Sequence, residues 1–164
     1  MRTRCEGCYA ELEGVDGPTH RYIGASPACW AIYTELMATG LPPSPRAPLL
    51  VDAYAAQHPG GTSPQATQSV AVHLVTLEAV VTHGHPLGRA VSLRQSAVEH
   101  GRRTGGYPKL EPVPSAWPVT VAQLAGGDGA LVDRMVDGVL ASWKELHADQ
   151  VDAWYRASLQ LTRS

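Results

Sequence analysis

The sequence predicts an all-α protein, a helical bundle of about five or six helices with an irregular N-terminal segment. Three observations lead to this prediction. No run alternates between apolar and polar residues for long enough to build a half-buried strand. Apolar residues recur at helical spacing in several segments, and Ser-Pro, Gly or Pro signals bound those segments. The first part of the chain is instead rich in turn residues and short on periodicity.

The size and composition indicate one globular unit. The chain has 164 residues, of which 44% are hydrophobic and 17% charged, as in ordinary globular domains. We therefore expect residues 1–164 to form a single domain, with an N-terminal knuckle (1–26) attached to a helical bundle (27–164). Phe is absent, so Leu, Trp, Tyr and Met must supply the large core side chains.

Start and stop signals bound each expected helix. Ser26 followed by Pro27 is an N-cap with proline at the first helical position, and the same pair of residue types opens the third helix. The Pro-rich stretch 41–48 and the Gly- and Pro-rich stretch 102–118 are predicted to be connections. The last helix is expected to bend near residues 147–149. In order, the expected helices cover residues 27–39, 48–58, 64–82, 87–101, 119–124 and 128–161.

Charge and hydropathy exclude several classes of partner. The formal net charge is -2 and no segment is strongly basic, so we expect no nucleic acid partner. No apolar run is long enough to cross a membrane, and the N-terminus lacks the apolar core of a secretory signal. We therefore expect a cytoplasmic protein with no membrane partner. The identity of a small-molecule or protein partner, and a homodimer, stay open.

The clearest chemical feature is the pair Cys5 and Cys8. Two thiolates at this spacing can reach one metal ion at about 2.3 Å, and Gly7 between them lets the chain curl around it. Cys29 is a natural third ligand, because it lies at the start of a predicted helix, where the helix dipole stabilises a thiolate. Structural zinc takes four ligands, so the sequence predicts zinc bound by three cysteines and one histidine.

Three histidines are candidates for the fourth ligand: His20, His58 and His73. We favour His58, because it lies at a helix end followed by Pro-Gly-Gly, where a side chain can turn towards the knuckle. A redox pair is a competing interpretation of the Cys-x-x-Cys motif. Such a pair is expected at a strand-to-helix junction, and none is predicted here. Plain reduced cysteines are the third interpretation.

Several histidines also lie on apolar helix faces, which allows a second site. His58, His73 and His147 each share a helical face with apolar residues. Inward-facing imidazoles on several helices can build a metal or proton-transfer site, although a hydrogen-bonded core histidine is the simpler interpretation of each. Asp52 could orient such a histidine. We therefore keep His20, Asp52 and His73 as candidates for a second site or pocket.

The residues that carry these signals lie in the strings CEGCYAELEGVDGPTHRYIGASPACW, VDAYAAQHPG and QSVAVHL. These strings resemble a family of small bacterial proteins known only as a domain of unknown function. The similarity runs from Cys5 to Leu74, and a weaker similarity is present in ASWKELHADQVDAWYRASL. That family has no established activity, so the resemblance implies no reaction. The resemblance implies that the motif residues are Cys5, Cys8, His20, Cys29, Asp52, His58 and His73.

The sequence leads to three functional hypotheses. In the first, zinc ties the knuckle to the bundle and has a structural role, without enzymatic activity. The second is a metal-dependent hydrolase with an open zinc site of three protein ligands and a water. The third is a thiol or metal sensor that uses the three cysteines. The first ranks highest, because the HExxH, GxSxG and P-loop signatures are all missing.

Overall fold

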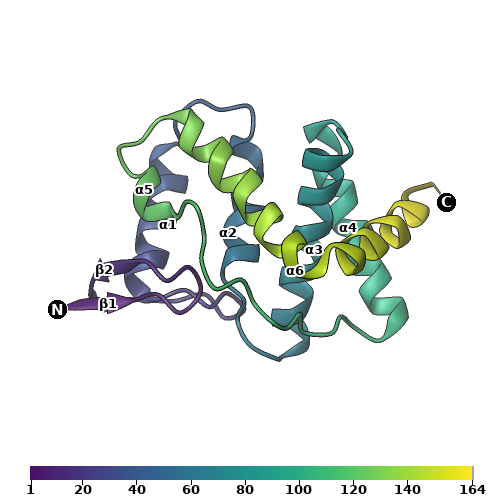
Figure 1. Cartoon of the computed structure of the whole chain (residues 1–164), viewed down its shortest axis with the longest axis horizontal. Helices are drawn as coiled ribbons and strands as arrows, with labels where there is room; N and C mark the ends of the chain where they lie inside the picture. The colour runs from purple at the N-terminus through teal and green to yellow at the C-terminus, as the bar shows by residue number, and fades with distance from the viewer. Residues whose placement is uncertain (164) are drawn as a thin grey trace.

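The computed structural model describes residues 1–163. Six α-helices in this range follow a two-stranded N-terminal hairpin (Figure 1), so the predicted all-α fold is confirmed. The elements in chain order are β1 (Arg2–Arg4), β2 (Glu11–Glu13), α1 (Pro27–Thr39), the 3₁₀ turn η1 (Ala47–Leu49), α2 (Leu50–Gln57), α3 (Pro64–Leu77), the π-helical turn η2 (Glu78–Thr82), the 3₁₀ turn η3 (Leu87–Arg89), α4 (Ala90–Thr104), α5 (Val121–Leu124) and α6 (Gly129–Arg163).

The hairpin is short and stands at one end of the molecule (Figure 1). Strands β1 and β2 pair antiparallel, with Arg2 opposite Glu13 and Arg4 opposite Glu11. Opposite charges at facing positions favour this register. The turn between the strands holds the Cys-x-x-Cys motif, so the hairpin presents both cysteines at its closed end.

Helices α1 and α3 start where the N-cap signals predict. The Ser26 hydroxyl accepts a hydrogen bond from the Cys29 amide, and the Ser63 hydroxyl accepts one from the Ala66 amide. These bonds satisfy amides that would otherwise have no partner in the first turn. Helix α1 ends at Gly40, whose φ of 97° is a conformation that other residues rarely adopt.

Helix α2 lies at the centre of the bundle. Seven of its eight residues are buried, and it packs against both α3 and α6. Ala53, Ala55 and Ala56 supply small contact surfaces, which let the neighbouring helices approach closely. Helix α6 runs diagonally across the molecule and contacts α2, α3 and α4 (Figure 1). Its Trp143 is buried and donates a hydrogen bond of 2.8 Å from Nε1 to the carbonyl of Ala56.

The predicted bend in the last helix is present at His147, where φ is -140° and ψ is 32°. Nε2 of His147 lies 2.7 Å from the carbonyl oxygen of Pro112. Helical spacing from Val139 and Trp143 also predicts that Leu146, one residue before the bend, faces the core, but Leu146 is 44% exposed. That prediction is wrong, because periodicity identifies an apolar helix face but not whether a neighbouring element covers it at that point.

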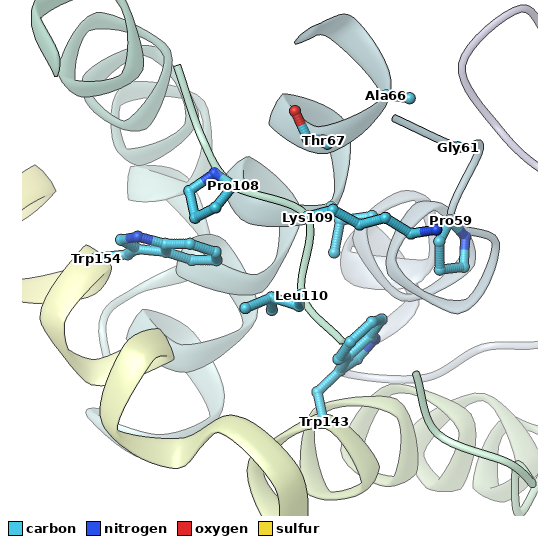
Figure 2. A pocket seen from close by; sticks show the side chains of 10 residues that line it. Pro59, Gly61, Ala66, Thr67, Pro108, Lys109, Leu110, Trp143 and Trp154 are labelled. Carbon is cyan, nitrogen blue, oxygen red and sulfur yellow. The ribbon is translucent and has the colours of Figure 1, made fainter. Parts of the chain in front are cut away.

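The long connection between α4 and α5 packs onto the bundle and the knuckle. Leu110 from this loop lies between Trp143 and Trp154 (Figure 2). The pocket that remains beside these residues has a volume of only about 10 Å³, enough for about one water molecule. Farther along the loop, Trp117 Nε1 donates a hydrogen bond of 2.9 Å to the carbonyl of Gly7. The loop therefore holds the cysteine-bearing turn against the helices.

Among the helices of residues 1–163, none combines the length and the apolar character that crossing a membrane would require.

Replacing Trp143 by Ala tests the packing of α6 on α2. The change removes a buried indole and its hydrogen bond, so we expect the free energy of unfolding to fall by about 3–5 kcal/mol. Leu146→Ala, in the next turn, should change it by no more than about 0.5 kcal/mol. Urea unfolding followed by circular dichroism measures both. Equal costs for the two variants would contradict the packing described above.

Candidate metal centre

Four predicted ligands come together at the junction of the knuckle with α1 and α2. The sulfur atoms of Cys5, Cys8 and Cys29 and a ring nitrogen of His58 all lie within 4.8 Å of one another. All four residues are buried. The structure thus places His58, rather than the other two candidate histidines, beside the thiols. The arrangement could hold a metal ion.

Local backbone geometry positions the two cysteines of the motif. The Tyr9 amide donates a hydrogen bond of 2.9 Å to the Cys5 carbonyl, and the Cys5 amide donates one of 2.9 Å to the carbonyl of Ala10. Tyr9 itself has a φ of 66°, which is left-handed and reverses the chain direction after Cys8. These contacts close a tight loop in which both sulfur atoms turn inward.

The other two ligands come from helix ends. Cys29 lies in the first turn of α1, where its amide is capped by Ser26 and the helix dipole favours a thiolate. His58 follows the last residue of α2 with φ of -124° and ψ of 69°, so its side chain leaves the helical path. The Gly24 amide donates a hydrogen bond of 2.9 Å to the His58 carbonyl. This bond joins the knuckle directly to the end of α2.

The distances between ligand atoms fit a tetrahedral site. Sγ of Cys8 lies 3.8 Å from Sγ of Cys29, and Sγ of Cys29 lies 3.3 Å from Nε2 of His58. A tetrahedral zinc with Zn–S of about 2.3 Å and Zn–N of about 2.0 Å separates two sulfurs by about 3.8 Å and a sulfur from a nitrogen by about 3.5 Å. The donor atoms therefore already stand near the corners that one ion would require.

Hydrogen bonds around the ligands set their protonation. The carbonyl of Tyr54 lies 2.7 Å from Nδ1 of His58. A carbonyl only accepts, so Nδ1 carries the proton and Nε2 presents a lone pair to the thiols. The Tyr54 hydroxyl lies 3.3 Å from Sγ of Cys29 and can donate to a thiolate there. The Ser26 amide also donates to Sγ of Cys5 at 3.5 Å.

The three thiols compete for negative charge when no cation is present. The hydrogen bond with Cys29, followed by the one with Cys8, lowers the pKa of Cys5. The hydrogen bond with Cys5, followed by the one with Cys8 and by burial, raises the pKa of Cys29. Hydrogen bonds from the neighbouring thiols thus stabilise one thiolate, that of Cys5. Three buried thiolates would need a cation to neutralise their charge.

Comparison with known families agrees with the resemblance seen in the sequence. Residues 3–160 match a family of unknown function, DUF5946. The chain belongs to the DUF5946 family. No curated protein and no solved structure matches it. The DUF5946 match contains all four residues of the metal centre as well as His20, Asp52 and His73.

Close backbone packing in this DUF5946 chain surrounds the centre. A Cβ atom added at Gly7 would lie 2.6 Å from Cδ2 of His58 and 2.7 Å from the carbonyl oxygen of Gly24. A Cβ at Gly24 would lie 2.3 Å from the carbonyl oxygen of Pro59, and one at Gly60 would lie 2.2 Å from that of Tyr22. Only glycine fits at these three positions, so the knuckle and the segment after α2 touch backbone to backbone.

The remaining candidates lie away from the thiols. Asp52 is fully buried, and its Oδ1 lies 2.7 Å from Nδ1 of His73. Arg94 from α4 donates to both oxygens of Asp52, at 2.8 and 2.5 Å, and the Asp52 carboxylate raises the pKa of Arg94. His20 lies beside Trp30, with ring centroids 5.3 Å apart. The sequence contains no signal for Arg94, because only the packing of α3 against both α2 and α4 brings it to its partner.

A second group of potential ligands escaped the sequence analysis. Glu78, His83 and Asp152 offer ligand atoms within 4.8 Å of one another. Glu78 is buried on the π-helical turn, but its carboxylate already accepts hydrogen bonds from Lys144 at 3.1 Å and from Thr82 at 2.9 Å. The ammonium group of Lys144 neutralises the carboxylate, so this group is an ion pair between η2 and α6.

A glycine pair tests how tightly the metal centre is packed. In Gly7→Ala, the new methyl group would meet the backbone of Gly24 and of His58, so we expect metal affinity to fall by at least about tenfold. Gly17→Ala lies in the same knuckle with nothing within 4 Å of the new Cβ, and it should leave affinity unchanged. Competition with a chromogenic zinc chelator measures both. Unchanged affinity in Gly7→Ala would refute the close packing.

Proposed function

We propose that this protein binds one zinc ion through Cys5, Cys8, Cys29 and His58, and that the zinc has a structural role. The observation that carries the proposal is the convergence of four buried ligand atoms at tetrahedral spacing. The ion joins the N-terminal knuckle to the start of α1 and the end of α2. The free energy of zinc binding then contributes directly to the stability of the fold.

The donor set favours zinc over other metal ions. Three thiolates and one imidazole are soft or intermediate ligands, which suit zinc and not the oxygen-seeking magnesium or calcium. Four donors in a tetrahedron are the usual structural zinc site. The proton on Nδ1 of His58 is held by the Tyr54 carbonyl, which is the outer hydrogen bond that zinc-binding histidines usually make.

Burial and coordination favour a structural role over a catalytic one. A catalytic zinc usually keeps one position for water or substrate, whereas four protein ligands leave none. Asp52 and His73 are bonded to each other elsewhere and do not supply a general base at the thiols. A thiol sensor requires accessible sulfur atoms, but Cys5 and Cys29 are fully buried and Cys8 nearly so.

Metal analysis of the purified protein tests the proposal. We expect one zinc per chain, and X-ray absorption should find three sulfur neighbours and one nitrogen neighbour. Cobalt substituted for zinc should give the absorption bands of a tetrahedral thiolate site. Removing zinc with a chelator should lower the melting temperature and speed amide exchange in residues 5–26 first, because two of the four ligands, Cys5 and Cys8, lie in this segment.

Two histidine variants supply the matched control. His58→Gln should bind zinc at least about tenfold more weakly, whereas His100→Gln, on α4 outside the centre, should bind it normally. Three protein ligands and a bound water would overturn the structural role and favour a hydrolase. The proposal itself would be refuted if the purified protein carried no zinc and its melting temperature did not respond to added zinc.

A further inference from the structure

A second feature of the molecule is a cleft between the knuckle and the helices. Its walls come from residues 20–23 and from α1, α2, α3 and α4, and its volume is about 560 Å³. This lies within the range of small-molecule sites, roughly 300–1,000 Å³. The pocket of Figure 2 is far too small for a ligand. We call this larger feature the aromatic cleft, because Tyr22, Trp30 and Tyr33 line it.

His73 lines the cleft with one nitrogen already engaged. Its Nδ1 faces the carboxylate of Asp52 at 2.7 Å, and a carboxylate only accepts, so Nδ1 carries the proton. Arg94 pairs with both oxygens of the same carboxylate, so the charge of Asp52 is balanced without a charge on His73. In the neutral ring, Nε2 of His73 presents a lone pair, and no group in residues 1–163 is bonded to it.

His20 lines the same cleft with the opposite tautomer. Its Nδ1 accepts a hydrogen bond of 3.0 Å from the Tyr22 amide, so the proton of the neutral ring lies on Nε2. The cleft thus contains one imidazole that accepts through Nε2 and one that donates through Nε2. The two tautomers are set by different partners, an Asp carboxylate for His73 and a backbone amide for His20.

The rest of the lining selects for an uncharged, flat molecule. No Asp, Glu, Lys or Arg of the described residues lines the cleft. Aliphatic side chains from α2, α3 and α4 line it together with the aromatic rings, and Gln65, Gln68 and Ser69 of α3 add uncharged polar groups. Trp30 is half-buried and its ring lies 5.4 Å from that of Tyr33. Aromatic rings in this arrangement favour stacking with another ring.

We propose that the aromatic cleft binds a small uncharged aromatic molecule that carries both an N–H or O–H donor and a hydrogen-bond acceptor. The ligand's donor bonds to Nε2 of His73, and its acceptor receives the Nε2 proton of His20. Its ring packs against Trp30 and the neighbouring aliphatic side chains. Asp52 acts as the positioning residue, because it fixes the tautomer and the orientation of His73.

This proposal is independent of the role of the metal, although the two sites share a wall. Trp30 follows Cys29 in the chain, and Tyr22 precedes the segment that bonds to His58. Binding is therefore measured on the full, metal-loaded chain, so that a failure reports on the cleft and not on a loosened knuckle.

Three probes of similar shape separate the two hydrogen bonds. Benzimidazole has a ring N–H donor and a ring nitrogen acceptor, 1-methylbenzimidazole keeps only the acceptor, and indole keeps only the donor. Each is titrated into isotope-labelled protein at a pH where probes and imidazoles are uncharged. The indole N–H signal of Trp30 reports binding, and those of Trp117, Trp143 and Trp154 serve as internal controls. We expect benzimidazole to bind in the millimolar range, and both relatives about five- to tenfold more weakly.

Variants then assign each hydrogen bond to a histidine. In His73→Ala, benzimidazole should lose one hydrogen bond and bind only as weakly as 1-methylbenzimidazole. In His20→Ala, benzimidazole should bind only as weakly as indole. His100→Ala lies outside the cleft and should bind all three probes as the unaltered chain does.

Several results would overturn the proposal. One is equal affinity of the three probes for the unaltered chain, a comparison that depends on no variant. Another is a Trp30 signal that shifts no more than the other indoles. A third is a Trp30 signal that moves with protein concentration and not with probe, since the cleft would then be a contact surface between two copies of the chain.

Discussion

The structure depends on three sulfur atoms and one imidazole that meet in the buried interior. Cys5 and Cys8 come from the hairpin turn, Cys29 from the start of α1 and His58 from the end of α2. Three thiolates so close together repel one another, and burial removes the solvent that would screen them. A cation at the centre would convert this repulsion into attraction, and it would add to the glycine contacts and hydrogen bonds that already join these segments.

The effect of this convergence extends beyond the four ligands. The hydrogen bond from Gly24 to the His58 carbonyl and the glycine contacts at Gly7 and Gly60 seat the knuckle on the end of α2. Once seated, the knuckle places residues 20–23 along α1, where His20 meets Trp30. One wall of the aromatic cleft is thus built by the same contacts that assemble the metal centre. The residues of the candidate metal centre can in this way shape the neighbouring cleft.

Charge is balanced locally on the other side of the cleft. Asp52 is fully buried, yet it is satisfied by Arg94 and His73 from two different helices. The three residues tie α2, α3 and α4 together and leave the cleft lining free of net charge. Burying the Asp52 carboxylate without these partners would destabilise the fold by several kcal/mol. The same three residues therefore stabilise the helix packing and keep the cleft lining free of net charge.

The sequence alone determined the helices, their caps and the chemistry of the metal ligands. These follow from local rules: Ser26 and Ser63 cap because of the residues beside them, and the Cys-x-x-Cys spacing fits one ion. The sequence also favoured His58 as the fourth ligand, because of the helix end and the Pro-Gly-Gly after it. Only the tertiary structure placed its imidazole beside the thiols, revealed Arg94 as the partner of Asp52 and showed Leu146 to be exposed. Each of these depends on which elements meet in space, and such long-range contacts leave no periodic signal in the chain.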